Sequence, residues 1–251
     1  MIIAEAFLLV FATLGIGLSP FYLYLRSKMT RSNKPHEYSK KTIFRVAGMH
    51  FCMMFTATAI QVIILQSLLN GSQLLTQRAI FVVSIQVLFL AAALYGSGIY
   101  ITSILFETFV TRKYLVIRFL HGPLSHTIIY TSYLGTFANL GFIAAALNTH
   151  TTIALWPILF IYGVVTGVVV AIDNYANGIL LISLIVSSIA LGVFIFLNSG
   201  VNSFTYFFMG IDIGLLVMGG LLAVTRIIQG KRLSWYDPIN IFGAPHLVKG
   251  R

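Results

Sequence analysis

The stretch AIFVVSIQVLFLAAALYGSGIYITSILFE, residues 79–107, decides the fold class of this chain. Its only charged residue is Glu107, at the last position. About 20 consecutive, mostly apolar residues are enough for an α-helix to cross the hydrocarbon core of a bilayer. The stretch is therefore predicted to form a transmembrane helix.

Six further apolar runs lie along the chain, separated by turn-forming sequences such as NGSQ, HGP and NSGVNS. They are Ile2–Leu25, Ile43–Leu69, Pro123–Leu147, Thr152–Ile172, Gly178–Leu197 and Phe204–Arg226. Together with Ala79–Glu107 they predict an all-α, multi-pass membrane protein, in which residues 1–228 form a bundle of seven transmembrane helices. Residues 229–251 mix basic and aromatic side chains and are predicted to form a cytoplasmic tail.

The composition agrees with this fold class. Of the 251 residues, 58% are hydrophobic and 9% are charged, and the mean hydropathy is +0.93. A soluble domain carries about 25% charged residues, so these residues could not build a water-soluble surface. The net charge of +10 would suit a nucleic-acid partner, but the basic residues lie in particular loops between apolar runs. We therefore expect the lipid bilayer, and no nucleic acid, as a partner.

The basic loops also predict the orientation in the membrane. Residues 26–45 contain seven Lys and Arg, residues 112–118 contain three, and residues 226–251 contain five. The alternate set of loops contains only Arg78. Because cytoplasmic loops are enriched in Lys and Arg, the N-terminus is predicted outside and the C-terminus inside the cell membrane.

Polar residues recur at helical spacing along five of the predicted spans. Polar groups in hydrocarbon need partners, so these stripes are predicted to face the bundle interior or a partner subunit. The glycine pairs of GVVTG (163–167) and GIDIG (210–214) have the small-xxx-small spacing that permits close helix packing. The five stripes are His50, Met54, Thr58 and Gln61; Gln86, Ala93, Ser97, Tyr100 and Glu107; His126, Tyr130, Tyr133 and Phe137; Tyr162, Thr166 and Asp173; and Thr205, Asp212 and Gly219.

A first candidate site lies near the predicted cytoplasmic side. His50 and His126 each lie close to the inner start of a span, and His121, Glu107 and Asp173 lie at the same end. Two imidazoles from facing helices, His50 and His126, suit the axial positions of a b-type haem. A metal ion held by His50, His121, His126 and Glu107 is a related interpretation. A proton relay or solute gate uses the same residue types, and simple anchoring at the interface is the remaining alternative.

A second candidate site lies in the outer half. Asp212 is about 13 Å into its span at the rise of an α-helix, and Gln86 and Gln61 reach comparable depths. A carboxylate at this depth is costly when charged and marks a functional site, and no Lys or Arg lies deep enough to pair with it. We predict that Asp212, Gln86 and Gln61, with Asp173 toward the inner side, serve transport or proton transfer.

The stretch FFMGIDIGLLVMGGLLAVTR, residues 207–226, resembles the last helix of microbial rhodopsins. It shares an intramembrane acid, Asp212, within a Phe- and Met-rich helix, later glycines and a terminal Arg226. The resemblance implies an opsin-like protein of seven helices. The chain departs from the family at Leu216, which stands where the family carries its retinal-bearing lysine, so no Schiff base can form in this span.

Three classes of function stay open. The first is a subunit of a larger membrane complex, with electron transfer through a haem on His50 and His126 as one form of it; its partners would be other membrane subunits or a second copy of the chain. The second is a transporter or channel for a small solute or protons that uses Asp212. The third is an intramembrane enzyme, although the chain has no HExxH, Gly-rich phosphate-loop or GxSxG motif.

Overall fold

The computed structural model describes residues 2–30, 40–70, 77–109, 119–147, 155–197 and 202–233. Within these ranges the regular secondary structure is entirely helical, which confirms the all-α prediction. A short π-helical turn, η1, leads directly into α5. The elements are α1 (Ile2–Thr30), α2 (Lys40–Asn70), α3 (Gln77–Phe109), η1 (Leu120–Leu124), α5 (Ser125–Ala146), α6 (Trp156–Asn177), α7 (Leu180–Leu197) and α8 (Ser203–Ile228).

Each of the seven predicted spans corresponds to one described helix. Six of these helices are long and apolar enough to cross a membrane, and the seventh, α7, is a shorter apolar helix. The 18 residues of α7 extend about 27 Å, slightly less than the roughly 30 Å hydrocarbon core of a bilayer. These lengths and compositions support a multi-pass membrane protein, whereas its orientation stays a prediction. The tail prediction concerns mainly residues 234–251, which lie outside the described ranges.

A clear difference from the predicted boundaries lies at the end of α6. Residues 173–177, predicted as part of a loop, continue the helix, and the chain turns only at Gly178. Gly178 has φ +78°, in the left-handed region that glycine adopts without strain. Its N–H donates to the carbonyl of Tyr175 (3.2 Å), and the N–H of Ile179 donates to that of Asn174 (2.9 Å). This capping pattern joins α6 and α7 in a tight hairpin and places Asp173 inside α6.

We expect the substitution Gly178→Ala to lower the thermal unfolding midpoint, with a loss of about 1 kcal/mol in the free energy of unfolding, because alanine is disfavoured at positive φ. The measurement is thermal unfolding of the detergent-solubilised protein, followed by tryptophan fluorescence. The control is Gly220→Ala in α8, where an added Cβ has no atom within 4 Å. An equal loss in both variants would contradict the proposed role of the turn.

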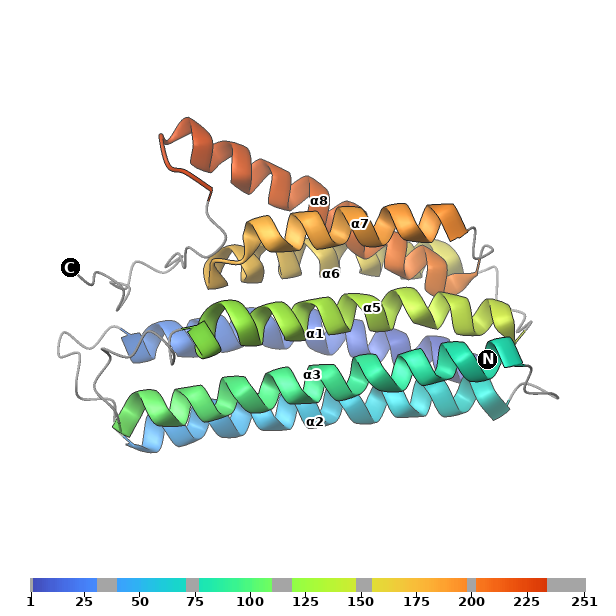
Figure 1. Cartoon of the computed structure of the whole chain (residues 1–251), viewed down its shortest axis with the longest axis horizontal. Coiled ribbons are helices and arrows are strands. Elements are labelled where there is room, and N and C mark those ends of the chain that lie inside the picture. Colours follow the sequence, from blue (N-terminus) through green and yellow to red (C-terminus); the bar gives the residue numbers. More distant parts are fainter. Residues whose placement is uncertain are drawn as a thin grey trace.

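The helices form three groups (Figure 1). α2 and α3 lie side by side at one edge, α6, α7 and α8 lie at the other, and α1 and α5 lie between them. α5 contacts α3 on one side and α7 and α8 on the other, and α3 contacts both α2 and α5. α8 diverges from the other helices toward its C-terminal end. The central position of α5 means that its side chains can contribute to sites on both sides of it.

The closest helix pair is α6 and α8, which run parallel through the two glycine pairs named above. A Cβ atom added to Gly163, Gly167, Gly210 or Gly214 would come within 2.1–2.4 Å of a backbone oxygen of the other helix. Each glycine therefore lies directly against opposing backbone, which confirms that these small-xxx-small spacings are packing surfaces. This contact holds the middle of α8, including Asp212, in a fixed position against α6.

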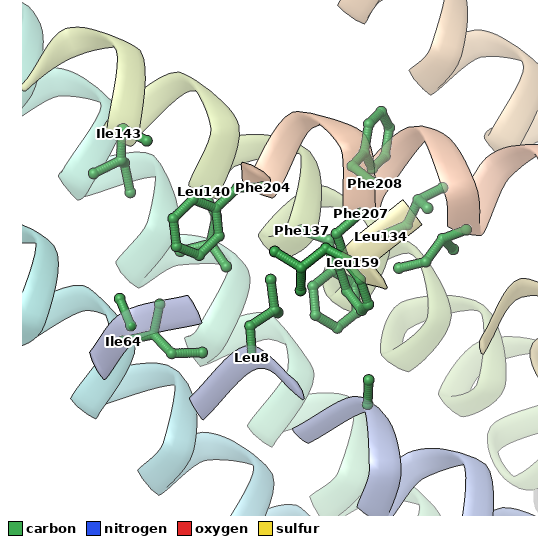
Figure 2. Close-up of a cluster of buried hydrophobic side chains, with 14 of the residues drawn as sticks. Leu8, Ile64, Leu134, Phe137, Leu140, Ile143, Leu159, Phe204, Phe207 and Phe208 are labelled. Carbon is green, nitrogen blue, oxygen red and sulfur yellow. The ribbon is translucent and has the colours of Figure 1, made fainter. Parts of the chain in front are cut away.

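Buried leucine, isoleucine and phenylalanine side chains pack together at the end of the bundle where α8 begins (Figure 2). The rings of Phe137 and Phe207 have centroids 5.4 Å apart, those of Phe194 and Phe208 5.0 Å apart, and that of Phe11 lies 5.3 Å from Phe137. Edge-on and tilted ring pairs at such distances are favourable. With Phe204 these residues form what we call the phenylalanine layer. It occupies the space between Asp212 and the N-terminal end of α8.

Candidate functional site

Asp212 is fully buried in α8, nine residues after the first residue of that helix, Ser203. One carboxylate oxygen, Oδ1, accepts a hydrogen bond from the hydroxyl group of Ser187 on α7. The other oxygen, Oδ2, has no hydrogen-bond partner among the residues that the structure describes. A charged carboxylate in this position is costly. A proton on Oδ2 would remove the charge and with it most of this cost.

Hydroxyl groups continue from Asp212 toward the end of the bundle where α5 and α7 begin. The Tyr130 hydroxyl of α5 donates to the backbone carbonyl of Ser183 (3.1 Å), and Tyr130 is an electrostatic neighbour of Ser187 and Asp212. Ser183 lies one helical turn before Ser187 on α7. We call Asp212, Ser187, Tyr130 and Ser183 the polar track. Because the phenylalanine layer covers the opposite side of Asp212, the polar environment of this acid is one-sided.

Asp173, the other acid predicted for transport, lies further along in the same direction. It is half-buried near the end of α6, and one of its carboxylate oxygens accepts a hydrogen bond from the side-chain amide of Asn177 (3.1 Å). It lies more than one helical turn beyond Gly167, which packs against Ile211 next to Asp212. The two acids are thus separate groups at different depths in the bundle.

Gln86 and Gln61 are fully buried, as predicted from their stripes. The side-chain hydrogen bond of Gln86, however, is made with α5 and not with the Asp212 region. The side-chain amide of Asn139 donates to the Gln86 side-chain oxygen (3.0 Å) and to the Val82 carbonyl (2.7 Å). We call Gln86, Asn139 and the buried Thr136, one turn from Asn139, the amide cluster. The prediction placed Gln86 and Asp212 in one site. In the structure they belong to two polar groups: Gln86 bonds to Asn139 where α3 packs on α5, and Asp212 bonds to Ser187 where α7 packs on α8.

The two predicted haem ligands, His50 and His126, meet at Tyr100. The His50 and Tyr100 ring centroids are 4.5 Å apart, and those of Tyr100 and His126 are 5.1 Å apart. The two imidazoles therefore lie at one level of the bundle, as expected from their positions in the spans. Both pack on the Tyr100 ring, so an axial pair on one haem iron would require Tyr100 to move. Haem ligation by these histidines stays a prediction.

The predicted metal site includes two residues whose side chains lie outside the part of the chain that the structure describes, His121 and Glu107. The backbone of His121 lies in η1 and that of Glu107 in α3. Among the described side chains, no group of three or more His, Cys, Asp and Glu residues could hold a metal ion. The metal site formed by His50, His126, His121 and Glu107 stays a prediction.

Sequence reasoning did not select Ser183, Ser187 or Asn139. The two serines are four residues apart on α7, which places them on one helix face, and this spacing could have identified them as a polar stripe. Asn139 is an amide within an apolar run, a position where a hydrogen-bonding partner is expected. The identity of each partner, in contrast, depends on which helices lie side by side.

No protein-family model, curated protein or solved structure matches this chain. The likeness of residues 207–226 to the last helix of microbial rhodopsins stays a resemblance of one helix, and α8 contains no lysine. The function is inferred below from the geometry of the buried polar groups.

Proposed function

We propose that this chain is a membrane-embedded proton carrier, a proton-coupled transporter or proton channel in which Asp212 binds and releases the proton. The observation that carries the proposal is the buried Asp212 carboxyl group, with one oxygen bonded to Ser187 and the other without a hydrogen-bond partner among the described residues. An ionisable side chain inside a transmembrane bundle is typical of ion and proton pathways.

The ligands around Asp212 favour a proton over a metal cation. Ca²⁺ takes roughly 6–8 oxygen ligands, and Mg²⁺ requires near-ideal octahedral geometry. The described neighbours offer one carboxyl group and the hydroxyl groups of Ser187 and Tyr130. A proton needs a single oxygen, and Oδ2 of Asp212 supplies it.

The polar track supports a route for this proton. Serine and tyrosine hydroxyl groups both donate and accept hydrogen bonds, so rotation of the Ser187 and Tyr130 hydroxyls can move a proton to or from Asp212. With the predicted orientation, the track leads toward the cytoplasmic side and the phenylalanine layer faces the outside. In this conformation Asp212 would exchange protons with the cytoplasm, and transport would require the layer to open.

The test measures proton flux through the purified protein in liposomes that contain a pH-sensitive dye. A potassium diffusion potential should drive proton movement faster than in protein-free liposomes. Dicyclohexylcarbodiimide, an apolar reagent that modifies protonated carboxyl groups, should block the flux and modify the peptide that contains Asp212. Flux equal to that of protein-free liposomes, or block by modification of an acid other than Asp212, would overturn the proposal.

A further inference from the structure

The amide cluster has no role in the proton route, and its place in the fold is well defined. α3 and α5 run antiparallel, with Gln86 opposite Asn139 and Phe89 opposite Gly135, where an added Cβ would come 2.3 Å from the Phe89 ring. Thr136, next to Gly135, lies between these two contacts along α5 and is fully buried. The cluster is therefore enclosed in the tightly packed α3–α5 contact.

Hydrogen-bonding groups of the cluster are only partly used. The Asn139 amide group donates both of its hydrogens, one of them to the side-chain oxygen of Gln86. The side-chain nitrogen of Gln86 and the Thr136 hydroxyl have no partner among the described residues. A buried donor or acceptor left without a partner costs about 1–3 kcal/mol. Thr136 lies one helical turn from Asn139, which bonds to Gln86, and this arrangement favours an occupant that bonds to both groups.

Gln61 adds a further amide at the same level. It lies nine residues before Asn70, the end of α2, and Gln86 lies nine residues after Gln77, the start of α3. Since α2 and α3 are antiparallel neighbours (Figure 1), the two glutamines have equal depth in the bundle. Neither the oxygen nor the nitrogen of the Gln61 side chain has a hydrogen-bond partner in the described part of the chain.

The charge of the surroundings limits the chemistry of the occupant. No Asp, Glu, Lys or Arg occurs in α5 or between Arg78 and Glu107 of α3. An ion bound to the cluster would thus meet no opposite charge on the two helices that form it, and a charge buried without a partner is costly. A neutral molecule avoids this cost. The nitrogen of Gln86 requires an acceptor on that molecule, and the Asn139 side-chain oxygen and the Thr136 hydroxyl can accept from a donor on it.

We infer that Gln86, Thr136 and Asn139 form a binding site for a small neutral molecule with both a hydrogen-bond donor and an acceptor, of the class of an amide, a polyol or water. The site lies on the α3 side of α5, whereas Tyr130 extends from α5 toward α7. It does not require proton binding at Asp212. If the proposed function also holds, this site gives the class of solute that moves with the proton.

The experiment measures permeation through the full-length protein in liposomes by stopped-flow light scattering. Acetamide and glycerol probe solute entry. Sucrose added outside the liposomes creates an osmotic gradient that draws water out, and this probes water movement. We expect the wild-type protein to accelerate at least one of the three above the rate of protein-free liposomes. Gln86→Leu should return that rate to the protein-free value, because leucine cannot bond to the occupant.

Two further variants keep the inference falsifiable. Thr136→Val replaces the hydroxyl group with a methyl group and should reduce permeation. This variant tests the site even if Gln86→Leu fails to fold. Gln66→Leu makes the matched change at an exposed position on α2 and should retain the wild-type rate. Acceleration limited to water would identify water as the occupant, and acceleration of acetamide or glycerol would identify a solute; both support the site.

The inference is overturned if no probe exceeds the protein-free rate, or if Gln86→Leu and Thr136→Val both fold and retain the wild-type rate. Asp212→Asn separates this site from the proton site. Loss of proton flux with retained downhill permeation would support both proposals. Retained proton flux in Asp212→Asn would overturn the proposed function. The permeation results would still test the binding site for a neutral molecule.

Discussion

Replacement of Gly167 by alanine is expected to destabilise the protein by about 3 kcal/mol and to disrupt the contact between α6 and α8. The added Cβ would lie 2.1 Å from the backbone oxygen of Ile211 and 2.8 Å from the backbone nitrogen of Leu215. Backbone atoms of a packed helix cannot rotate away, so the two helices have to separate. Overpacking of this kind typically costs 1–3 kcal/mol and occasionally more. Thermal unfolding of the detergent-solubilised protein measures the effect.

The matched control is Gly192→Ala in α7, where an added Cβ has no atom within 4 Å. Alanine is the better helix former by about 1 kcal/mol, so this variant should be as stable as the wild type or more stable. The two substitutions make the same chemical change but should move the unfolding midpoint in opposite directions. Similar shifts in both variants would show that α6 and α8 are not held together by backbone contact at the glycines.

The fold class could be predicted because the bilayer imposes a simple rule on the sequence. A span needs about 20 apolar residues, and each of the seven predicted apolar runs corresponds to one described helix. The end of α6 was placed wrongly, because Asp173 and Asn174 resemble turn residues. Their side chains are tolerated in the helix, where Asp173 bonds to Asn177, and the stop signal is the left-handed Gly178.

The candidate sites could be predicted only in part. Depth along a helix follows from the sequence, and for this reason Asp212 and Gln86 were identified as buried polar residues. Contacts between helices do not follow from depth. Gln86 bonds to Asn139 because α3 packs on α5, and Asp212 bonds to Ser187 because α7 packs on α8. A periodic pattern in one span contains no information on which neighbour it faces.

Asp212→Asn is expected to abolish proton flux in liposomes, reducing it to the protein-free rate, while the protein stays folded. Asparagine has nearly the same shape as aspartate and keeps an oxygen that can accept the Ser187 hydrogen bond. Its amide group cannot exchange a proton as a carboxyl group does. Like the protonated acid, asparagine is uncharged and carries its donor at the position of Oδ2, so the unfolding midpoint should stay unchanged.

Two companion variants show whether the effect belongs to Asp212 alone. Ser187→Ala removes the hydroxyl group that bonds to Asp212 and should slow the flux without abolishing it, at a cost of about 1 kcal/mol in stability. Asp173→Asn changes a half-buried acid near the end of α6 and should retain most of the flux, because this group lies beyond the polar track. Abolished flux in Asp173→Asn, together with wild-type flux in Asp212→Asn, would move the proton site to the α6–α7 turn. A loss confined to Asp212→Asn is explained by a single exchangeable proton on Oδ2, the oxygen without a hydrogen-bond partner among the described residues.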